Sequence, residues 1–532
     1  MNQKGKNWLF ALMLTLPMCF FFIAYLLNHD TSLHPTGFIQ HDNISYIAYA
    51  KQYLDTDKTS ILYSNPFNDA DNYRPIYFQI QTLLFAGLLK AGIPPGWILI
   101  PFTFLCSLLC FKLIIAIYDH IVSTRKYRII SIWLFAWGGG LLTVAGFFTQ
   151  LYYGTAKVHS VFFLDPAVGW WGLNLGRSLF FSCESWYHFL FLSVIYGLLK
   201  QKWLVAFVAS ALLSVSHPFT GIELLLIVIP WSLFEKFIFR NREIPRWFLA
   251  GVSVVLIFHL YYYLFFLNQS PEHRSVSQQY SLNWRLRFFS MLPAYCLVGL
   301  LALFNICKND SLLFLKNNNN RLFLVWFLVA FGLANHELIM KPMQPIHFAR
   351  GYIWTALFLL GIPALHWLFE RSTQSNIQKI FVVLFITFFF SDNASWIYSQ
   401  SSFRSTTAST SYLTQEQRDI LKLLNQQSTN QTLLIGNIEL IPYLSTIYTD
   451  AYPWIAHPFT TPFVREKKDA LTLFLKSGTI DPSWRGRELI FVFDKRSALK
   501  IQPAFHLPSD HTLLAEMPSY KILKVKVPFD YH

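Results

Sequence analysis

Charged residues are scarce in this chain. Of its 532 residues, only 14% are Asp, Glu, Lys or Arg, whereas 54% are hydrophobic and 18% are aromatic. Soluble domains typically carry about 25% charged residues. This composition excludes an ordinary soluble globular protein and indicates a polytopic membrane protein.

Acidic residues are the scarcer of the two charged kinds, with 29 Asp and Glu against 43 Lys and Arg, which gives a formal charge of +14. A basic excess can indicate a nucleic-acid partner, but here the basic residues lie largely in short loops between apolar stretches. That distribution is the one expected of cytoplasmic loops in a membrane protein. We therefore expect no nucleic-acid partner and a membrane-lipid environment.

Cysteines are few and badly placed for a disulfide framework. All six lie within or beside apolar stretches, and the polar C-terminal region has none, so no such framework is indicated. The apolar N-terminal stretch also lacks a small-x-small cleavage site, so we interpret it as a retained first span. No internal repeat is evident.

What the chain has in abundance is apolar stretches long enough to cross a bilayer, and we expect about eleven spans. They lie near 8–27, 97–118, 129–148, 179–199, 203–217, 219–239, 248–267, 288–307, 322–339, 351–369 and 380–397. If they alternate, the basic loops share the cytoplasmic side with Lys4 and Lys6. The short segment 75–92 disturbs this alternation if it spans, so we expect a juxtamembrane or shallowly inserted helix there.

This topology divides the chain into a transmembrane module, 1–397, and a soluble tail, 398–532. The module has a large first outer loop at 28–96 that carries juxtamembrane helices. The tail alternates a helical pattern, LTQEQRDILKLLNQQS, with strand-like runs, TLLIGNI, ELIFVFD and YKILKVKV. We therefore expect a mainly α, polytopic helical membrane protein with a small C-terminal α/β domain on the outer face.

Ionisable residues in or near the spans fall mostly at their outer ends, and such groups usually mark a functional site. We take this convergence to indicate a polar cavity open to the outer face. The candidates are Asp42, Arg74, Asp165, Arg177, Glu184, His217, His336, Glu337, Lys341, His347 and Arg350.

Several candidates also have a structural interpretation, and both stay open. Glu184 can simply pair with Arg177, and His217 can cap the turn before Pro218. Asp165 can be a turn or helix-start residue, and Arg350 can be an interfacial anchor, although such anchors are favoured on the cytoplasmic side.

The stretch from Asp42 to Tyr53 predicts a helix with a distinct face. Asp42, Tyr46, Tyr49 and Tyr53 are separated by four, three and four residues, which places them on one side of a helix. An acid at the start of such a face, with aromatic rings below it, is typical of a segment that lies in an interface.

With its first-loop aspartate QHDNISY, the segment YRPIYFQIQTLLF, many spans and a polar tail that includes AYPWIAHPFTTPFVREKKDALTLF, the chain resembles the GT-C superfamily of membrane glycosyltransferases. Members of that superfamily take a sugar from a polyprenyl-phosphate carrier and use a first-loop carboxylate. Asp42 occupies the position of that carboxylate. Many members have two adjacent acids where this chain has Asp42 followed by Asn43, so we expect neither a metal nor another cofactor.

The resemblance implies an inverting hexosyl- or pentosyltransferase, with a lipid-linked sugar donor and an envelope glycan, lipid or protein acceptor. Asp42 is our candidate general base, with Asp165 and Glu184 as further catalytic candidates. Cations suit the leaving phosphate, and Arg350 and Arg74 come first, before Lys341, Arg177 and His347. Tyr46, Trp170 and Trp171 could stack on a sugar ring, although outer-interface aromatics are equally often membrane belts.

Two other functional classes remain as alternatives. In a lipid or sugar transporter, the same polar residues would line a path, but matched repeats and mid-depth charges are not evident. A non-catalytic membrane scaffold would leave the outer cluster unexplained. We expect the protein in the bacterial inner membrane, with a cytoplasmic N-terminus and a periplasmic C-terminus.

Overall fold

The computed structural model of the chain describes residues 3–27, 30–55, 60–68, 74–154, 175–279, 288–308, 311–371, 375–401, 410–497 and 511–528. It separates into two compact units. The helical unit comprises Met1–Leu27, Ile100–Tyr263 and Ser281–Ser405, and the mixed unit comprises Asn28–Leu99, Leu264–Tyr280 and Thr406–His532. Three segments far apart in the sequence therefore build each unit.

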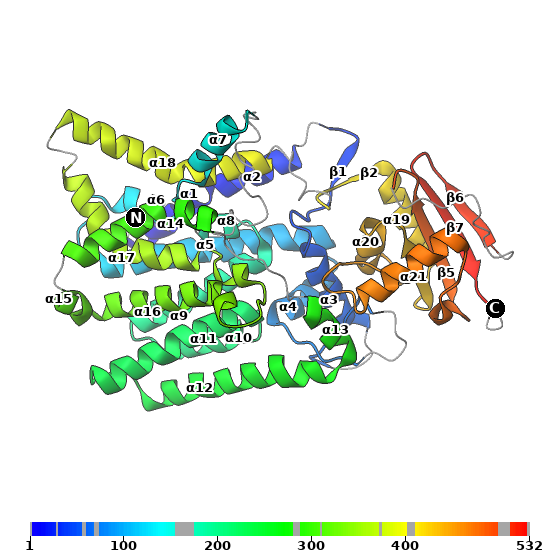
Figure 1. The fold of residues 1–532 in the computed structure, drawn as a ribbon, viewed down its shortest axis with the longest axis horizontal. Coiled ribbons are helices and arrows are strands. Elements are labelled where there is room, and N and C mark those ends of the chain that lie inside the picture. The colour runs from blue at the N-terminus through cyan, green and yellow to red at the C-terminus, as the bar shows by residue number, and fades with distance from the viewer. Residues whose placement is uncertain are drawn as a thin grey trace. The chain divides into compact units, whose positions relative to one another are not determined.

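The helical unit contains a helix at each of the eleven stretches expected to span (Figure 1). Its helices are α1 (Gln3–Leu14), α2 (Leu16–Leu26), α5 (Pro95–Ile121), α6 (Arg128–Trp137), α7 (Leu142–Tyr152), α8 (Leu175–Ser178), α9 (Ser182–Leu199), α10 (Trp203–Ser214), α11 (Pro218–Leu233), α12 (Arg246–Leu260), α14 (Phe288–Lys308), α15 (Ser311–Lys316), α16 (Asn318–Ala334), α17 (Tyr352–Arg371) and α18 (Asn376–Ser401). The unit also has two short π-helices, η2 (Phe234–Ile238) and η3 (Tyr261–Phe266), and two short 3₁₀-helices, η5 (His336–Leu338) and η6 (Pro345–Phe348), among the described residues.

Fewer than eleven of these helices meet the length and hydropathy expected of a complete span. Within the described residues, five do so, and up to seven do if each of two bent pairs counts as one span. The bent pairs are α1 with α2, at 41°, and α6 with α7, at 54°. The protein is thus a multi-pass helical protein, and the count of eleven is not confirmed.

A glycine break separates α6 from α7. Gly138, Gly139 and Gly140 approach neighbouring atoms so closely that an added Cβ would lie 2.2–2.8 Å from them. Asp392 on α18 fills the resulting gap in the hydrogen bonding, because its carboxylate accepts the backbone N–H groups of Gly140, Leu142 and Thr143 at 2.8–3.1 Å. The bend is therefore held by a side chain from a distant helix.

The mixed unit contains the predicted α/β region. Its five-stranded sheet has the order β4-β3-β5-β7-β6, in which β3 pairs in parallel with β4 and β5, and β7 pairs antiparallel with β5 and β6. The strands are β3 (Thr432–Gly436), β4 (Tyr452–Pro453), β5 (Glu488–Asp494), β6 (His511–Glu516) and β7 (Tyr520–Lys526). The strands expected from TLLIGNI, ELIFVFD and YKILKVKV are confirmed as β3, β5 and β7.

Helices of the mixed unit come from the first loop, from the middle of the chain and from the C-terminal region. They are α3 (Asn43–Asp55), α4 (Ile80–Lys90), η4 (Leu267–Gln269), α13 (Pro271–Gln279), α19 (Gln415–Gln427), α20 (Leu440–Tyr448), α21 (Val464–Ser477) and the short η8 (Pro482–Trp484). A capping box between Thr414 and Gln417 starts α19. At 11 residues, α4 is about 16 Å long, too short to cross a hydrocarbon core of about 30 Å.

The first loop and the tail meet directly within the mixed unit. Strand β1 (Leu33–Pro35) pairs antiparallel with β2 (Tyr412–Thr414), and α3 packs against α20. Tyr443 on α20 joins them further, because its hydroxyl donates to the carbonyl of His41 at 2.9 Å and lies 2.7 Å from the Ser45 hydroxyl. The segment before α3 is therefore fixed by the C-terminal region.

Candidate functional site

Asp42 lies immediately before α3, and its carbonyl accepts the N–H of Tyr46 at 3.4 Å. The predicted helix is confirmed, but its tyrosine face packs on the chain itself. The Tyr49 ring stacks on Tyr63 at 5.1 Å, and Tyr53 meets the edge of Tyr63 at 5.4 Å. Asp42 thus begins a helix whose aromatic face is already engaged.

Asn43, which directly follows Asp42, has a structural role in the turn before α3. Its side-chain oxygen accepts the N–H of Gln40 at 3.1 Å, and its own N–H donates to the Gln40 carbonyl at 3.1 Å. These bonds close the turn that presents Asp42 to its surroundings.

His457 is the partner of Asp42 that sequence reasoning missed. Its Nε2 lies 3.2 Å from Asp42 Oδ1, and its Nδ1 accepts the N–H of Phe459 at 3.2 Å. Because Nδ1 is an acceptor, the ring proton of the neutral imidazole belongs on Nε2, from which it donates to the carboxylate. The His457 side chain is 5% exposed and that of Asp42 is 52% exposed, so a buried ring holds an accessible carboxylate.

The loop around His457 is fixed by hydrogen bonds from its backbone to a threonine side chain. Thr461 Oγ1 accepts the N–H groups of Ala456 and His457 at 3.2 and 3.0 Å. The rings of His41 and Phe67 lie 5.1 and 6.3 Å from the His457 ring. The imidazole therefore has little freedom to leave Asp42.

His41 adds a second imidazole beside this pair. Burial, and then the proximity of His457, lowers the pKa of His41 from its ordinary value, against a smaller opposing effect of Asp42. Burial likewise raises the pKa of Tyr443 well above its ordinary value. His41 therefore lies within electrostatic range of both Asp42 and His457.

A second polar cluster lies in the helical unit, built from Arg177, Glu184, His217, His347 and Arg350. Glu184 on α9 pairs with Arg177 at 3.8 Å and with Arg350 at 3.9 Å. Both separations exceed the hydrogen-bond range of about 3.2 Å, so the carboxylate holds the two guanidinium groups by charge. All three side chains are less than 10% exposed.

Two histidines complete this arginine cluster. Arg350 hydrogen-bonds to Nδ1 of His347, whose ring lies 5.9 Å from that of His217. His217 caps α11, with Nδ1 accepting the N–H of Thr220 at 3.1 Å. The capping interpretation of His217 and the Arg177–Glu184 pair are thus both present, within a cluster that also contains Arg350.

Glu223 on α11 is a further buried acid that the sequence reasoning did not single out. It is fully buried and interacts electrostatically with Arg350. Its one signal in the sequence was an acid inside an apolar stretch, GIELLLIVIP, which is the pattern that marks intramembrane function.

The other predicted residues are dispersed. His336 is occupied locally, since Nδ1 lies 2.6 Å from the Leu333 carbonyl and Nε2 accepts the N–H of Met343 at 3.0 Å. Lys341 is exposed and Glu337 is partly exposed. Tyr46 and Arg74 lie in the mixed unit, where Tyr46 contacts Tyr49. Asp165, Trp170 and Trp171 lie outside the described residues.

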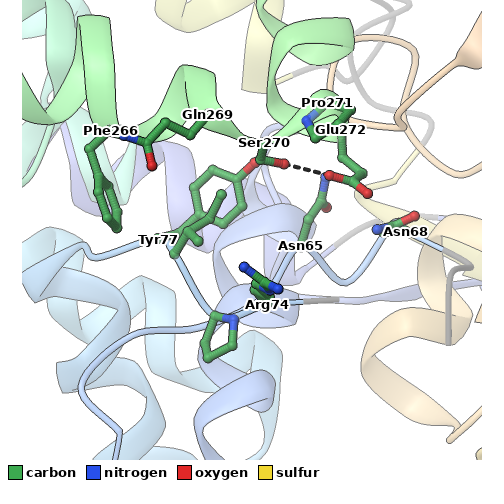
Figure 2. Close-up of a pocket in the computed structure, with 11 residues that line it drawn as sticks. Asn65, Asn68, Arg74, Tyr77, Phe266, Gln269, Ser270, Pro271 and Glu272 are labelled. Carbon is green, nitrogen blue, oxygen red and sulfur yellow. Dashed lines mark hydrogen bonds between the residues drawn. The ribbon is translucent and has the colours of Figure 1, made fainter. Parts of the chain in front are cut away.

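Arg74 lines a cavity of about 410 Å³ in the mixed unit. Figure 2 shows Asn65, Asn68 and Arg74 on one side, facing Gln269, Ser270 and Glu272 on the other. The Ser270 hydroxyl donates to the Glu272 carboxylate, and Tyr77 is hydrogen-bonded to His273 at 3.1 Å. Among the described residues, no group of three His, Cys, Asp or Glu side chains is arranged to hold a metal ion.

No protein-family model and no curated protein matches the sequence. The chain is similar in fold to several solved structures. One is ArnT from Cupriavidus metallidurans, solved in the apo state and bound to undecaprenyl phosphate. It is 13% identical, with a TM-score of 0.48 over 96% of this chain and 97% of ArnT.

Another is the oligosaccharyltransferase AglB from Archaeoglobus fulgidus, solved with an inhibitory peptide and a dolichol-phosphate. It is 12% identical, with a TM-score of 0.45 over 90% of this chain and 69% of AglB. At TM-scores below 0.5, these similarities do not decide what this chain does. Its activity has to be inferred from its own residues.

Proposed function

We propose that the chain is an inverting membrane glycosyltransferase that moves a sugar from a polyprenyl-phosphate carrier to an envelope acceptor on the outer face. The observation that carries this proposal is the half-exposed Asp42 carboxylate, fixed by a hydrogen bond from the buried His457. An oriented, accessible carboxylate is what a general base requires.

In the proposed reaction, the Asp42 carboxylate takes the proton of an acceptor hydroxyl. The hydroxyl oxygen forms a bond to the anomeric carbon, while the bond from that carbon to the phosphate oxygen breaks and the polyprenyl phosphate leaves with the electron pair. Attack from the face opposite the phosphate inverts the anomeric centre. His457 donates its N–H to the carboxylate. This hydrogen bond holds the carboxylate in place and in its proton-accepting form.

The growing charge on the phosphate calls for fixed cations, and we assign that role to Arg350, supported by Arg177. Arg350 is a buried arginine whose guanidinium is oriented by both His347 and Glu184. A planar guanidinium can donate two parallel hydrogen bonds to a phosphate. The proposed chemistry uses no metal, which stays a prediction.

The proposal is tested by transfer from radiolabelled polyprenyl-phosphate sugars to envelope lipids and glycans, using the purified protein in detergent. We expect the wild-type protein to transfer label from at least one carrier in the panel. Arg350→Ala should need a higher donor concentration and transfer more slowly, whereas Lys379→Ala, on an exposed side chain of α18, serves as the matched control. Transport of the intact carrier across vesicles without transfer would contradict the proposal.

A further inference from the structure

A second cavity adjoins the one that Arg74 lines. It has a volume of about 470 Å³ and shares Asn68 and Glu272 with the first cavity, whose volume is about 410 Å³. Each volume falls in the range of about 300–1,000 Å³ typical of small-molecule sites. The two cavities adjoin each other in the mixed unit, and we call them together the Glu272 groove.

The walls of the Glu272 groove carry charges of both signs beside apolar and aromatic side chains. The second cavity is lined by three acidic residues, Glu272, Glu466 and Asp481, and by three basic residues, Lys467, Arg485 and Arg487. The first cavity adds Arg74 beside Glu272, with the amides of Asn65, Asn68 and Gln269 (Figure 2). The groove as a whole therefore has four cations against three acids, a small excess that suits a ligand without a large net charge.

Planar amide, carboxylate and guanidinium groups, with the flat ring of Tyr77 among them, match the hydroxyl-rich edges and the faces of sugar rings. The walls also include the rings of Phe266, Trp454 and Phe463, and an aromatic ring can stack on the apolar face of a sugar. The chemistry of these walls thus favours a saccharide.

The Glu272 groove is joined to the Asp42 site by residues 65–68. Asn65 donates to the Thr460 carbonyl at 2.9 Å and accepts the N–H of Phe67 at 3.0 Å. The Phe67 ring in turn stacks against His457. The same short segment therefore forms the groove wall and packs against the imidazole that holds Asp42.

We infer that the Glu272 groove binds the saccharide part of the acceptor, a neutral or charge-balanced glycan, and delivers its hydroxyl group toward Asp42. This inference rests on the proposed transferase function, because only a transferase has an acceptor. The groove residues and Asp42 belong to the same compact unit.

The test measures binding, not turnover, so that it does not depend on the reaction. Full-length protein in detergent is applied to an array of bacterial envelope oligosaccharides that includes neutral, amino and phosphorylated sugars, with a pool of random peptides beside them. We expect binding to neutral or zwitterionic oligosaccharides. Glu272→Gln and Arg74→Gln, both at polar groove positions, should each weaken it by at least about tenfold.

Glu516→Gln is the matched control, because it removes an acid of β6 that pairs with Lys495 and is not among the residues that line the groove. It should bind as the wild type does, and thermal unfolding should show that all three variants are folded. Absence of glycan binding, equal binding by the groove variants, or preference for the peptide pool would each overturn the inference. Glycan binding without any sugar transfer would instead overturn the proposed function, and with it the acceptor role, and would leave the groove as a glycan-binding site.

Discussion

At the scale of single residues, the proposed chemistry depends on how Asp42 is held. His457 is a positioning residue, because it acts through Asp42 and its Nδ1 is occupied by the N–H of Phe459. The two residues are 415 positions apart, and no local pattern connects them. Asp42 itself could be predicted from its place before a helix, whereas His457 could not, since only the folded mixed unit brings the two together.

His457→Ala should reduce turnover by about 10- to 100-fold, a factor that corresponds to the free energy of one hydrogen bond to a charged group. His457→Gln should recover much of the rate, because the glutamine amide can donate from nearly the same place as Nε2. Initial transfer rates at saturating donor measure the effect. If the alanine and glutamine variants are equally impaired, a donated hydrogen bond is not what His457 supplies.

His273 makes the stability of the mixed unit depend on pH. Burial lowers the pKa of His273 from 6.5 to about 4. Below the unfolded value, the unfolded chain binds a proton that the folded chain does not bind until pH falls near 4, so stability is lost progressively between these two values. Thermal unfolding temperatures between pH 7 and pH 5 should fall less steeply for His273→Gln than for the wild type, and parallel curves would contradict this.

At the scale of elements, the sequence predicts most helices and strands but not how the long apolar stretches divide. The helix at α3, the capped helix α19 and the strands β3, β5 and β7 follow from periodicity and capping residues that act locally. The break between α6 and α7 does not, because apolarity continues across Gly138 to Gly140. What sets the bend is Asp392, about 250 residues later.

Asp392→Ala should therefore destabilise the helical unit. It removes the acceptor of three backbone N–H groups, two of them at buried positions, and we expect a loss of about 3 kcal/mol. Asp392→Asn keeps one acceptor oxygen and should lose less. Unfolding in detergent, followed by tryptophan fluorescence, measures both variants, and an alanine variant as stable as the wild type would show that the carboxylate does not hold the bend.

At the scale of the whole molecule, the composition correctly indicates a multi-pass helical protein with a small sheet-containing region. It does not indicate that residues 28–99, 264–280 and 406–532 gather in one compact unit. That grouping depends on long-range contacts, such as β1 with β2 and Ser45 with Tyr443. Patterns of hydropathy and charge along the chain do not indicate these long-range contacts.

The orientation of this assembly is a prediction that rests on the charges of the loops. We expect residues 398–532 to lie outside the cytoplasm. A reporter enzyme that is active only in the cytoplasm, fused after Tyr531, should be inactive, whereas the same reporter in the basic loop at 240–246 should be active. An active C-terminal fusion would place the tail, and with it the acceptor, on the cytoplasmic side.

The measurement that tests the central claim most directly is sugar transfer by Asp42→Asn protein. A general base typically contributes a factor of about 10² to 10⁴. Transfer from a radiolabelled polyprenyl-phosphate sugar should therefore fall by at least that order, while donor binding and thermal unfolding stay near those of the wild type. Equal transfer rates for the two proteins would contradict the assignment and move the search for the base to Asp165 or Glu184.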